Sequence, residues 1–427
     1  MHTHPHRLRR RIALVLTALL SPLPCLAQSI DAAHLSLPEA EKLLLDANPS
    51  ILQARAALAG ARAGIDIAGA RPNPQLSLGA TASDPGRKGS GSFWKQPTDN
   101  TVRIDQLIER GDKRDLRLRA ADSNLSATGA DLDNTIRLAR IDLANAWLDL
   151  RAARDIRRIA DENAALARRA SDAAELRGKA GDLAGVDVAR FAADAARVAN
   201  DAVQSGLALS RARLALALLL GNRIPSEQLD TSDDWPDAEP APTPAAAADA
   251  PERVDILAAR RRVEQAGTLR ELARAQRTRD VSIGVQYEHA PATANNAFST
   301  SSYGLSLSVP LFLGYDYRGD IARSEADYNA AEQQLVATRA AVGSEQARLR
   351  AEYAASQTRY QRLRDVVLPA AERAGRGADV AIQRGGMSLT DYLDTQRNLR
   401  AARIETIQAR ADLARAALMQ RLAGDPQ

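Results

Sequence analysis

The sequence VSIGVQYE at Val281–Glu288 alternates apolar and polar side chains without a break. Strict alternation predicts a β-strand with one apolar and one polar face. Three further stretches follow the same pattern: Leu76–Ala82, Thr101–Leu107 and Tyr303–Val309. The segments inside each pair, residues 83–100 and 289–302, are rich in Gly, Ser, Thr, Asn and Pro, which is typical of connections. Four strands in two hairpins are therefore predicted.

The two hairpins belong to two copies of one unit. Ile51–Arg55 recurs 205 residues later as Ile256–Arg260, and Leu76–Gly79 recurs at the same offset as Val281–Gly284. Three more matches keep the same order at offsets of 203 to 204: Gly111 with Gly314, Asp187 with Asp391, and Gly221 with Gly424. Matches in one order indicate an internal duplication. The copies are predicted at residues 28–230 and 251–427, joined by a Pro-, Ala- and acid-rich linker at 231–250.

Long helical segments surround each hairpin. They are predicted at Pro38–Ala70, Lys113–Ser171, Phe191–Leu220, Pro251–Arg277, Ile321–Leu368 and Thr390–Ala423. A helix of roughly 60 residues is a rod of about 90 Å. Narrow apolar stripes flanked by Ala favour long antiparallel coiled-coil packing. The fold class is therefore mainly α with a small β part.

The first 27 residues predict a secretory signal peptide. Four arginines precede an apolar run at Ile12–Leu20, and small residues follow at Cys25–Ala27. Acylation of Cys25 is the alternative interpretation. Removal of this segment takes four of the 57 basic residues and none of the 53 acidic ones, so the mature chain is formally neutral. A nucleic-acid partner is not indicated.

Beyond this segment, the sequence has no run of about 18 apolar residues that would span a bilayer as a helix. Amphipathic strands can cross a membrane in a closed barrel of about eight strands or more. One chain supplies four, so three chains would form a 12-stranded transmembrane β-barrel. A small soluble sheet is the alternative. Aromatic residues near the strands favour the membrane: Phe93, Trp94, Tyr287, Phe298, Tyr303 and Phe312.

The duplicated order of helix, hairpin and two long helices resembles the outer-membrane efflux protein family, which is TolC-like. Leu35–Ala40, Asn48-Pro49 and Arg71–Leu76 are most similar to its heavy-metal branch, the CzcC-type subunits. The resemblance implies a homotrimer whose β-barrel lies in the outer-membrane lipid of a Gram-negative bacterium. It also implies an α-helical barrel in the periplasm, a periplasmic adaptor (membrane fusion) protein and an inner-membrane pump of the RND type.

The function implied is that of a passive conduit in a tripartite efflux system for heavy-metal cations. Drug efflux and type I secretion are alternatives within the same class. A soluble periplasmic coiled-coil adaptor or structural protein is the alternative from another class. The mature sequence keeps only His34 and His289 and has no Cys, so we predict no enzyme, no cofactor and no catalytic or metal-binding residues.

The candidate functional residues lie at the bends between paired long helices. The first bend contains Gly178, Gly181 and Asp182 and leads to Asp187; the second contains Gly385, Gly386, Asp391 and Asp394. Glycine permits the reversal of the chain. These bends are also the candidate contacts for the adaptor.

Asp391 and Asp394 are three residues apart and share one helix face. Threefold symmetry would place six carboxylates around one opening and attract cations. The resemblance assigns this G-x5-D-x2-D pattern, here Gly385, Asp391 and Asp394, to a periplasmic aperture, with Asp187 a weaker candidate. Met387 and Ile382 stand where TolC-like proteins have a latching Arg and Tyr, so gating is left open. The alternative is that Asp391 offsets the helix dipole and Asp394 is a solvated surface acid.

Overall fold

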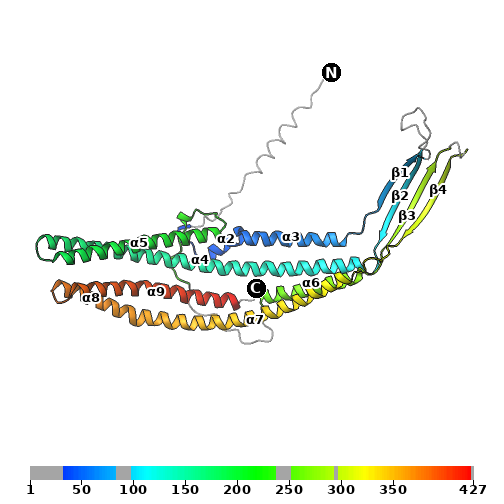
Figure 1. The fold of residues 1–427 in the computed structure, drawn as a ribbon. Helices are drawn as coiled ribbons and strands as arrows, with labels where there is room; N and C mark the ends of the chain where they lie inside the picture. Colours follow the sequence, from blue (N-terminus) through cyan, green and yellow to red (C-terminus); the bar gives the residue numbers. More distant parts are fainter. Residues whose placement is uncertain (1–31, 83–97, 237–251, 293–296, 425–427) are drawn as a thin grey trace, which may run out of the picture.

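The computed structural model describes residues 32–82, 98–236, 252–292 and 297–424. The molecule is elongated, with a bundle of long helices and a sheet that extends from one end of it (Figure 1). The predicted signal peptide with Cys25, the aromatic residues Phe93 and Trp94, and most of the predicted linker lie outside the described residues. The signal and linker assignments therefore stay predictions.

The first copy of the repeat begins with the short 3-10 turn η1 (Ala32–His34). It continues with α2 (Leu37–Ala47), α3 (Pro49–Gly69), β1 (Gln75–Ala82), β2 (Thr98–Ile108), α4 (Lys113–Lys179), α5 (Gly185–Leu219) and the turn η3 (Ser226–Gln228). The helical stretch predicted over Pro38–Ala70 consists of two helices, because Asn48 separates α2 from α3. The Asn48 side chain accepts hydrogen bonds from the backbone N–H groups of Ser50 (3.0 Å) and Ile51 (3.2 Å). It thereby caps a new helix whose first residue is proline.

The second copy contains α6 (Val254–Ala275), β3 (Val281–Ala290), β4 (Thr300–Ser308), α7 (Arg318–Arg362), α8 (Leu368–Gln383) and α9 (Leu389–Gly424). The helical segment predicted over Ile321–Leu368 also contains an interruption. A π-helical turn, η4 (Leu363–Val367), separates α7 from α8. Pro369 follows this turn at the start of α8 and has no backbone N–H to donate to the preceding turn. The widened turn accommodates this missing hydrogen bond.

The four strands form one antiparallel sheet in the order β1-β2-β3-β4. The two repeats meet at the β2–β3 pair, where Val102 lies opposite Tyr287. One face carries the apolar side chains, which are exposed in the protomer: Leu76, Leu78, Val102, Ile104, Ile283, Val285, Tyr287, Tyr303, Leu305 and Leu307. The predicted alternation is confirmed. None of the helices in the described ranges is both long and apolar enough to span a bilayer.

The hydrophobic core lies near the middle of the molecule, where α2, α4 and α5 of the first repeat meet the C-terminal end of α9 of the second (Figure 1). Trp147 of α4 is almost fully buried, and its indole Nε1 donates to the backbone oxygen of Leu35 at 2.9 Å. Leu35 also forms a parallel β-bridge with Thr231. Leu418 of α9 belongs to the same cluster, so the core joins both repeats.

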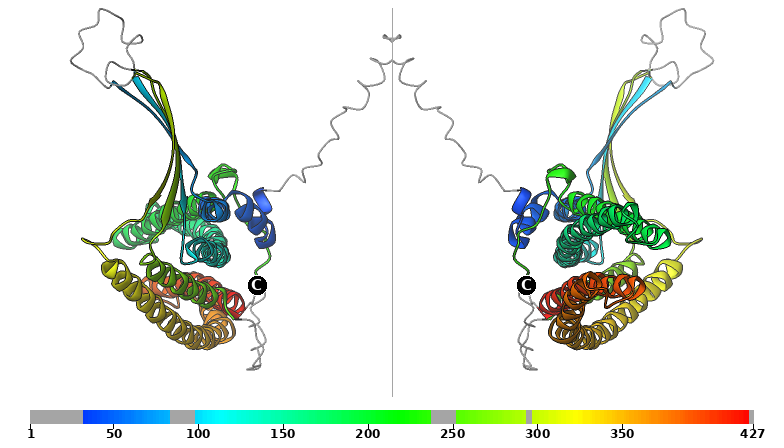
Figure 2. Two further views of the ribbon diagram at one scale, coloured as in Figure 1. Left: turned by 90° about the vertical axis from the view of Figure 1, so that its right-hand side faces the viewer. Right: turned by 90° about the vertical axis from the view of Figure 1, so that its left-hand side faces the viewer.

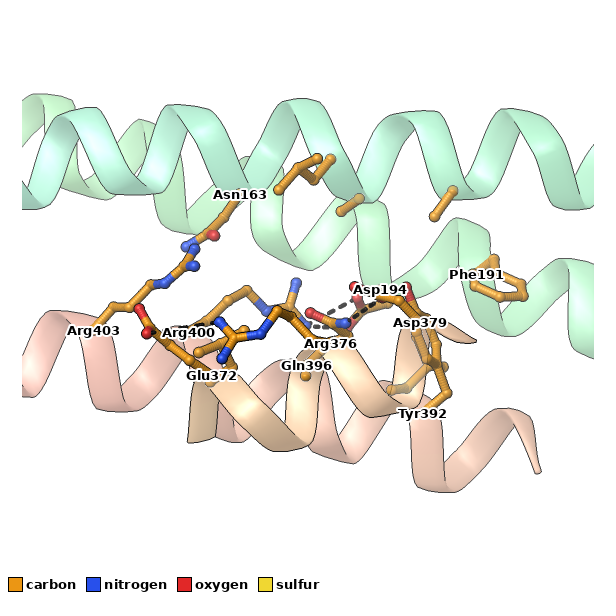
Figure 3. A pocket seen from close by; sticks show the side chains of 16 residues that line it. Asn163, Phe191, Asp194, Glu372, Arg376, Asp379, Tyr392, Gln396, Arg400 and Arg403 are labelled. Atoms are coloured by element: carbon orange, nitrogen blue, oxygen red, sulfur yellow. Dashed lines mark hydrogen bonds and ion pairs between the residues drawn. The ribbon is translucent and has the colours of Figure 1, made fainter. Parts of the chain in front are cut away.

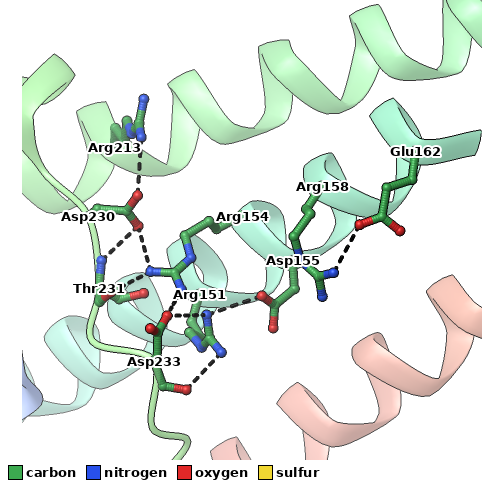
Figure 4. Close-up of polar contacts among 9 residues, drawn as sticks. All are labelled: Arg151, Arg154, Asp155, Arg158, Glu162, Arg213, Asp230, Thr231 and Asp233. Carbon is green, nitrogen blue, oxygen red and sulfur yellow. Dashed lines mark hydrogen bonds and ion pairs between the residues drawn. The ribbon is translucent and has the colours of Figure 1, made fainter. Parts of the chain in front are cut away.

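A polar network holds the C-terminal segment of the first repeat, which includes Asp230 and Asp233, against helix α4 (Figure 4). Arg154 interacts with the carboxylates of Asp230 and Asp233. The ring of Trp235 lies between two guanidinium groups, 5.3 Å from that of Arg151 on α4 and 5.0 Å from that of Arg410 on α9. Residues 231–236, which the sequence assigns to the linker, are therefore packed against both repeats.

Candidate functional site at the helical tips

Both predicted bends lie at the end of the helical bundle opposite to the sheet (Figure 1). The first joins α4 to α5, and the second joins α8 to α9. Gly181 has φ +83° and Gly385 has φ +73°, a left-handed conformation that glycine adopts without strain. Gly178 is needed for close packing instead, because a Cβ there would lie 2.7 Å from Cγ2 of Val188. The two bends therefore depend on their glycines for different reasons.

The second tip presents the two predicted aspartates at the start of α9, and both are exposed. The Ser388 hydroxyl donates to Oδ2 of Asp391 at 2.7 Å, and the Asp391 N–H donates to the Ser388 oxygen at 3.2 Å. Asp394 accepts a hydrogen bond from Nη1 of Arg397 at 2.9 Å. Within one protomer each carboxylate thus has a local partner. The aperture role concerns the assembled protein and stays a prediction.

The first tip comes close to the second through one arginine. Nη1 of Arg190 lies 3.4 Å from Oδ1 of Asp187 and 3.5 Å from the hydroxyl of Thr390. The structure therefore brings Asp187 near the second tip. Asp182 is exposed, and its N–H donates to the backbone oxygen of Arg177 at 2.9 Å. Its role in adaptor contact stays a prediction, as do those of the four tip glycines.

A polar cavity of about 180 Å³ lies behind the tips, between α4 and α5 of the first repeat and α8 and α9 of the second (Figure 3). Arg400 of α9 donates to both carboxylate oxygens of Asp194 on α5, at 3.1 and 3.3 Å. The Asp194 residue is only 9% exposed. Removal of one partner would leave a largely buried charge uncompensated, which is far more costly than the loss of a surface pair.

This ion pair was missed in the sequence, although a signal for it exists. Asp194 lies on the buried face of α5, in line with Val198, Ala202 and Ser205. A carboxylate within such a face requires a cationic or hydrogen-bonding partner. The partner itself is 206 residues away in the other repeat. Helical periodicity therefore indicates that Asp194 is paired, whereas only the folded structure identifies Arg400.

Tyr392, next to Asp391, packs into the same region. Its ring lies 6.4 Å from that of Phe191 on α5. Burial, the negative charge of Asp379 and a hydrogen bond to that carboxylate raise the pKa of Tyr392 to about 12. Gln396 also donates to Oδ1 of Asp379, at 2.8 Å. Met387 and Ile382 are half-buried and have no side-chain group that could form a polar latch. Tyr392 and Arg400 thus provide polar contacts of α9 that the sequence did not reveal.

Known proteins share both the sequence pattern and the fold. A family model described as "Outer membrane efflux protein" matches residues 41–222 and 250–423. The chain is 25% identical over 375 residues to the cobalt-zinc-cadmium resistance protein CzcC of Cupriavidus metallidurans, covering 87% of this chain and 86% of that protein.

Two solved structures have the same fold over nearly their whole length. One is a membrane protein from Pseudomonas aeruginosa, with a TM-score of 0.76 and 19% identity, covering 95% of this chain and 93% of that one. The other is the outer membrane protein VceC from Vibrio cholerae, with a TM-score of 0.71 and 22% identity, covering 91% and 96%. The helical bundle with its small sheet is therefore a known architecture.

Replacement of Tyr392 by Phe should make the protein less sensitive to alkali. The folded state raises the tyrosine pKa from 10.0 to about 12, so it binds the hydroxyl proton more tightly than the unfolded chain does. The resulting stabilisation is complete below about pH 10 and is lost as the pH rises to about 12. After a discount for solvent screening we expect a contribution of about 1–2 kcal/mol.

The measurement is the midpoint of thermal unfolding between about pH 8 and about pH 12. Tyr392→Phe should show a shallower decline above about pH 10 than the wild type. Tyr360→Phe, on α7 and outside the cavity, serves as the matched control and should decline as the wild type does. Equal slopes for Tyr392→Phe and the wild type would contradict the prediction.

Proposed function

The chain belongs to the outer membrane efflux protein family, and from this premise we propose that three copies form a passive conduit from the periplasm to the exterior. It is a protein of the Gram-negative outer membrane with its helical part in the periplasm. In the proposed tripartite system, an inner-membrane pump of the RND type supplies the energy and a periplasmic adaptor joins the two. Proteins of this family are channels and not enzymes.

The observation that carries this proposal is the pair of open edges on the protomer. β1 and β4 are the edge strands of the sheet. Along the helices, α3 and α5 pack on one side of α4, while α7 and α8 lie on the opposite side of the molecule (Figure 2). One edge is therefore built from the first repeat and the other from the second. Contact between two different edges is heterologous, and such contacts form a ring when the rotation between successive copies closes.

Helix α5 has the surface that such a ring requires. Its buried face, which includes Val198 and Leu216, packs on α4. Its opposite face carries a stripe of large apolar side chains that are 45–67% exposed: Val203, Leu207, Leu214 and Leu218. A helix with two opposite apolar faces needs a neighbour on each side. We assign the second neighbour to the α7–α8 edge of another copy, where Val366 and Val380 are exposed.

The exposed surfaces of the sheet support the same assembly. Its apolar face is open, with Leu78 and Leu305 among its exposed side chains. Three copies joined through their β1 and β4 edges would provide the 12 strands of a barrel, with this face against outer-membrane lipid. The polar face, which includes Arg103 and Asp105, would line the water-filled lumen. Arg103 donates to Asp105 and to Ser306 there, so these polar groups are satisfied across the sheet.

Heavy-metal cations are the substrate class that we propose. The support is the likeness to a protein named for cobalt, zinc and cadmium resistance. Among the residues that the structure describes, no group of three or more His, Cys, Asp or Glu side chains is arranged to hold a metal ion. A conduit need not bind its cargo, so selection would fall to the pump. Drug efflux and type I protein secretion are the alternatives, and a growth experiment separates drug efflux from metal export.

Aspartate in the α5 stripe should prevent trimer formation. Leu214→Asp with Leu218→Asp removes two apolar contacts, each with about 1.5–3 kcal/mol of burial energy, at every subunit interface. We expect a monomer in detergent by size-exclusion chromatography with light scattering, with helical content unchanged because both side chains are exposed in the protomer. Ala208→Asp, which is exposed but off the stripe, should remain trimeric. A trimer of the double variant would exclude this face as the interface.

Loss of the tip aspartates should change conduction. Asp391→Ala with Asp394→Ala would remove six negative charges from the proposed aperture, and single-channel recordings should show cation preference reduced about threefold or more and weaker block by multivalent cations. Asp391→Asn with Asp394→Asn should have the same effect, since asparagine keeps a capping oxygen but has no charge. Asp327→Asn, on α7 near the sheet, is the matched control. Wild-type selectivity and block in both double variants would refute the aperture role.

Deletion of the gene tests the substrate class. We expect growth of the deletion strain to fail at lower concentrations of one or more of zinc, cobalt, cadmium and copper, while tolerance of dyes stays unchanged. A plasmid copy of the gene should restore resistance. Sensitivity to dyes alone would assign the conduit to drug efflux and would contradict the metal assignment.

A further inference from the structure

The turn that joins β4 to α7 has apolar side chains on its outside. It begins at Val309 and projects from the side of the molecule, where the sheet meets the helices (Figure 2). Every second residue from Val309 to Tyr315 is apolar or aromatic, which continues the alternation of β4 beyond its last paired residue. Leu311 is 67% exposed and Leu313 is 89% exposed. The apolar face of the sheet is therefore extended to the junction with the helices.

Aromatic contacts hold this turn in place. The Phe312 ring packs edge-on against the Tyr317 ring at 5.1 Å, and the Tyr315 ring lies 5.4 Å from that of Tyr317. The Tyr315 hydroxyl donates to Oδ2 of Asp320 at 3.0 Å and accepts from the Asp320 N–H at 3.1 Å. The turn is thus packed through its rings, and the exposed leucines are presented by an ordered backbone.

Two exposed arginines lie beside the turn. Arg279 is two residues before Val281 and so is in phase with the apolar positions of β3. Its guanidinium lies 5.5 Å from the centre of the Phe312 ring. Arg110 follows the end of β2, and its backbone N–H donates to Oδ1 of Asp280, the residue next to Arg279, at 3.0 Å. The two arginines are therefore neighbours at the junction of the sheet with the helices.

These two positive charges have no acidic partner in the part of the chain that the structure describes, where no carboxylate lies within 4.0 Å of either guanidinium. Asp112 and Asp115 are exposed nearby, but they lie at the start of α4, where they offset the positive end of the helix dipole. The other carboxylates of this region are already bound: Asp280 by Lys113, Glu109 by Arg117, Asp316 by Arg318 and Asp320 by Tyr315.

We propose that Arg110, Arg279, Leu311 and Leu313 form a rim that binds an anionic phospholipid of the inner leaflet of the outer membrane. The proposal rests on the conduit proposed above, in which the apolar face of the sheet meets lipid and the helices lie in the periplasm. The rim is then at the depth of the headgroups on the periplasmic side. The guanidinium groups would bind the lipid phosphate, while the leucines would lie at the start of the acyl chains.

Charge complementarity is the reason to expect an anionic lipid at this rim. A zwitterionic headgroup carries its own ammonium group, so it has no net charge to offset two unpaired guanidinium groups. An arginine close to an anionic membrane surface strengthens binding about fivefold. Three copies of the chain would place six such arginines around the proposed barrel. We therefore expect the lipid in contact with the rim to be enriched in phosphatidylglycerol.

The test is electron paramagnetic resonance of spin-labelled phosphatidylglycerol and phosphatidylcholine with the purified protein in vesicles of unlabelled phosphatidylcholine. We expect the wild type to associate with the phosphatidylglycerol label about threefold or more strongly than with the phosphatidylcholine label. In Arg110→Gln with Arg279→Gln this ratio should fall to about one. Arg110→Lys with Arg279→Lys should keep most of the preference, because lysine keeps the charge. A salt concentration of about 1 M should lower the wild-type ratio by screening.

A matched control removes two arginines elsewhere. Arg55 on α3 and Arg197 on α5 are exposed and lie within the helical bundle. Arg55→Gln with Arg197→Gln should have the wild-type lipid ratio, although its net charge changes by the same amount. A general effect of protein charge on lipid association would lower the ratio in both double variants and would contradict the proposal.

The depth of the rim can be measured independently. The sequence has one cysteine, Cys25 in the predicted signal peptide, so a spin label on Leu313→Cys is specific. In vesicles this label should be accessible to oxygen and largely protected from a water-soluble nickel chelate. A label on Ala337→Cys, an exposed position about five turns into α7, should be accessible to the chelate.

Three results would overturn the proposal: equal association of the wild type with both lipids, an unchanged ratio in Arg110→Gln with Arg279→Gln, or free access of the chelate to the label at position 313. Conduction by the same vesicles distinguishes this failure from that of the conduit. Protein that conducts without preferring phosphatidylglycerol would refute the rim alone. Protein that neither enters vesicles nor conducts would refute both.

Discussion

The structure depends on one constraint, which is that a sheet in a membrane must satisfy every backbone N–H and C=O group within itself. Four strands with unpaired edges at β1 and β4 cannot meet it. Their apolar face, which includes Leu78 and Leu305, is exposed and would also be unstable in water. Both deficits disappear when the edges of several copies pair and the apolar face meets lipid. The duplication contributes because it places the two hairpins side by side, with Val102 opposite Tyr287.

The helical part, which lies in water, also has open edges and exposed apolar surface that other copies would cover. Chain continuity carries the edge of the sheet into the edge of the bundle, since β1 follows α3 and β4 precedes α7. On α5, Leu216 faces α4 whereas Leu214 faces away from it. The proposed assembly would place a helix of this kind inside a closed layer, with a neighbour on each side. One mode of association therefore accounts for the open surfaces of the sheet and of the helices together.

Sequence patterns predicted the elements better than their interruptions and contacts. Period-two alternation located all four strands, because each strand has one apolar and one polar face. The break at Asn48 was missed because helical periodicity continues on both sides of it, although the Asn-Pro pair is a known cap signal. The π-turn before Pro369 was missed for the same reason. At the candidate site, the glycines that reverse the chain could be predicted from the sequence. The partner of Asp194 could not, because it lies in the other repeat and no local pattern identifies it.

The two ends of the helical bundle are held by unequal forces. Near the middle, buried side chains of both repeats, such as Trp147 of the first and Leu418 of the second, pack in one cluster, and each contributes burial energy of about 1.5–3 kcal/mol. At the tips, α5 and α9 meet through Arg400 with Asp194, Arg190 with Thr390, and one aromatic contact. The exposed contact of Arg190 contributes about 0–1 kcal/mol, whereas the Asp194–Arg400 pair is largely buried and loss of one partner would be more costly. The repeats are therefore joined by an extended apolar cluster at the middle and by a few polar and aromatic contacts at the tips. We therefore expect a protein docked at the tips to separate them more readily than the middle of the bundle.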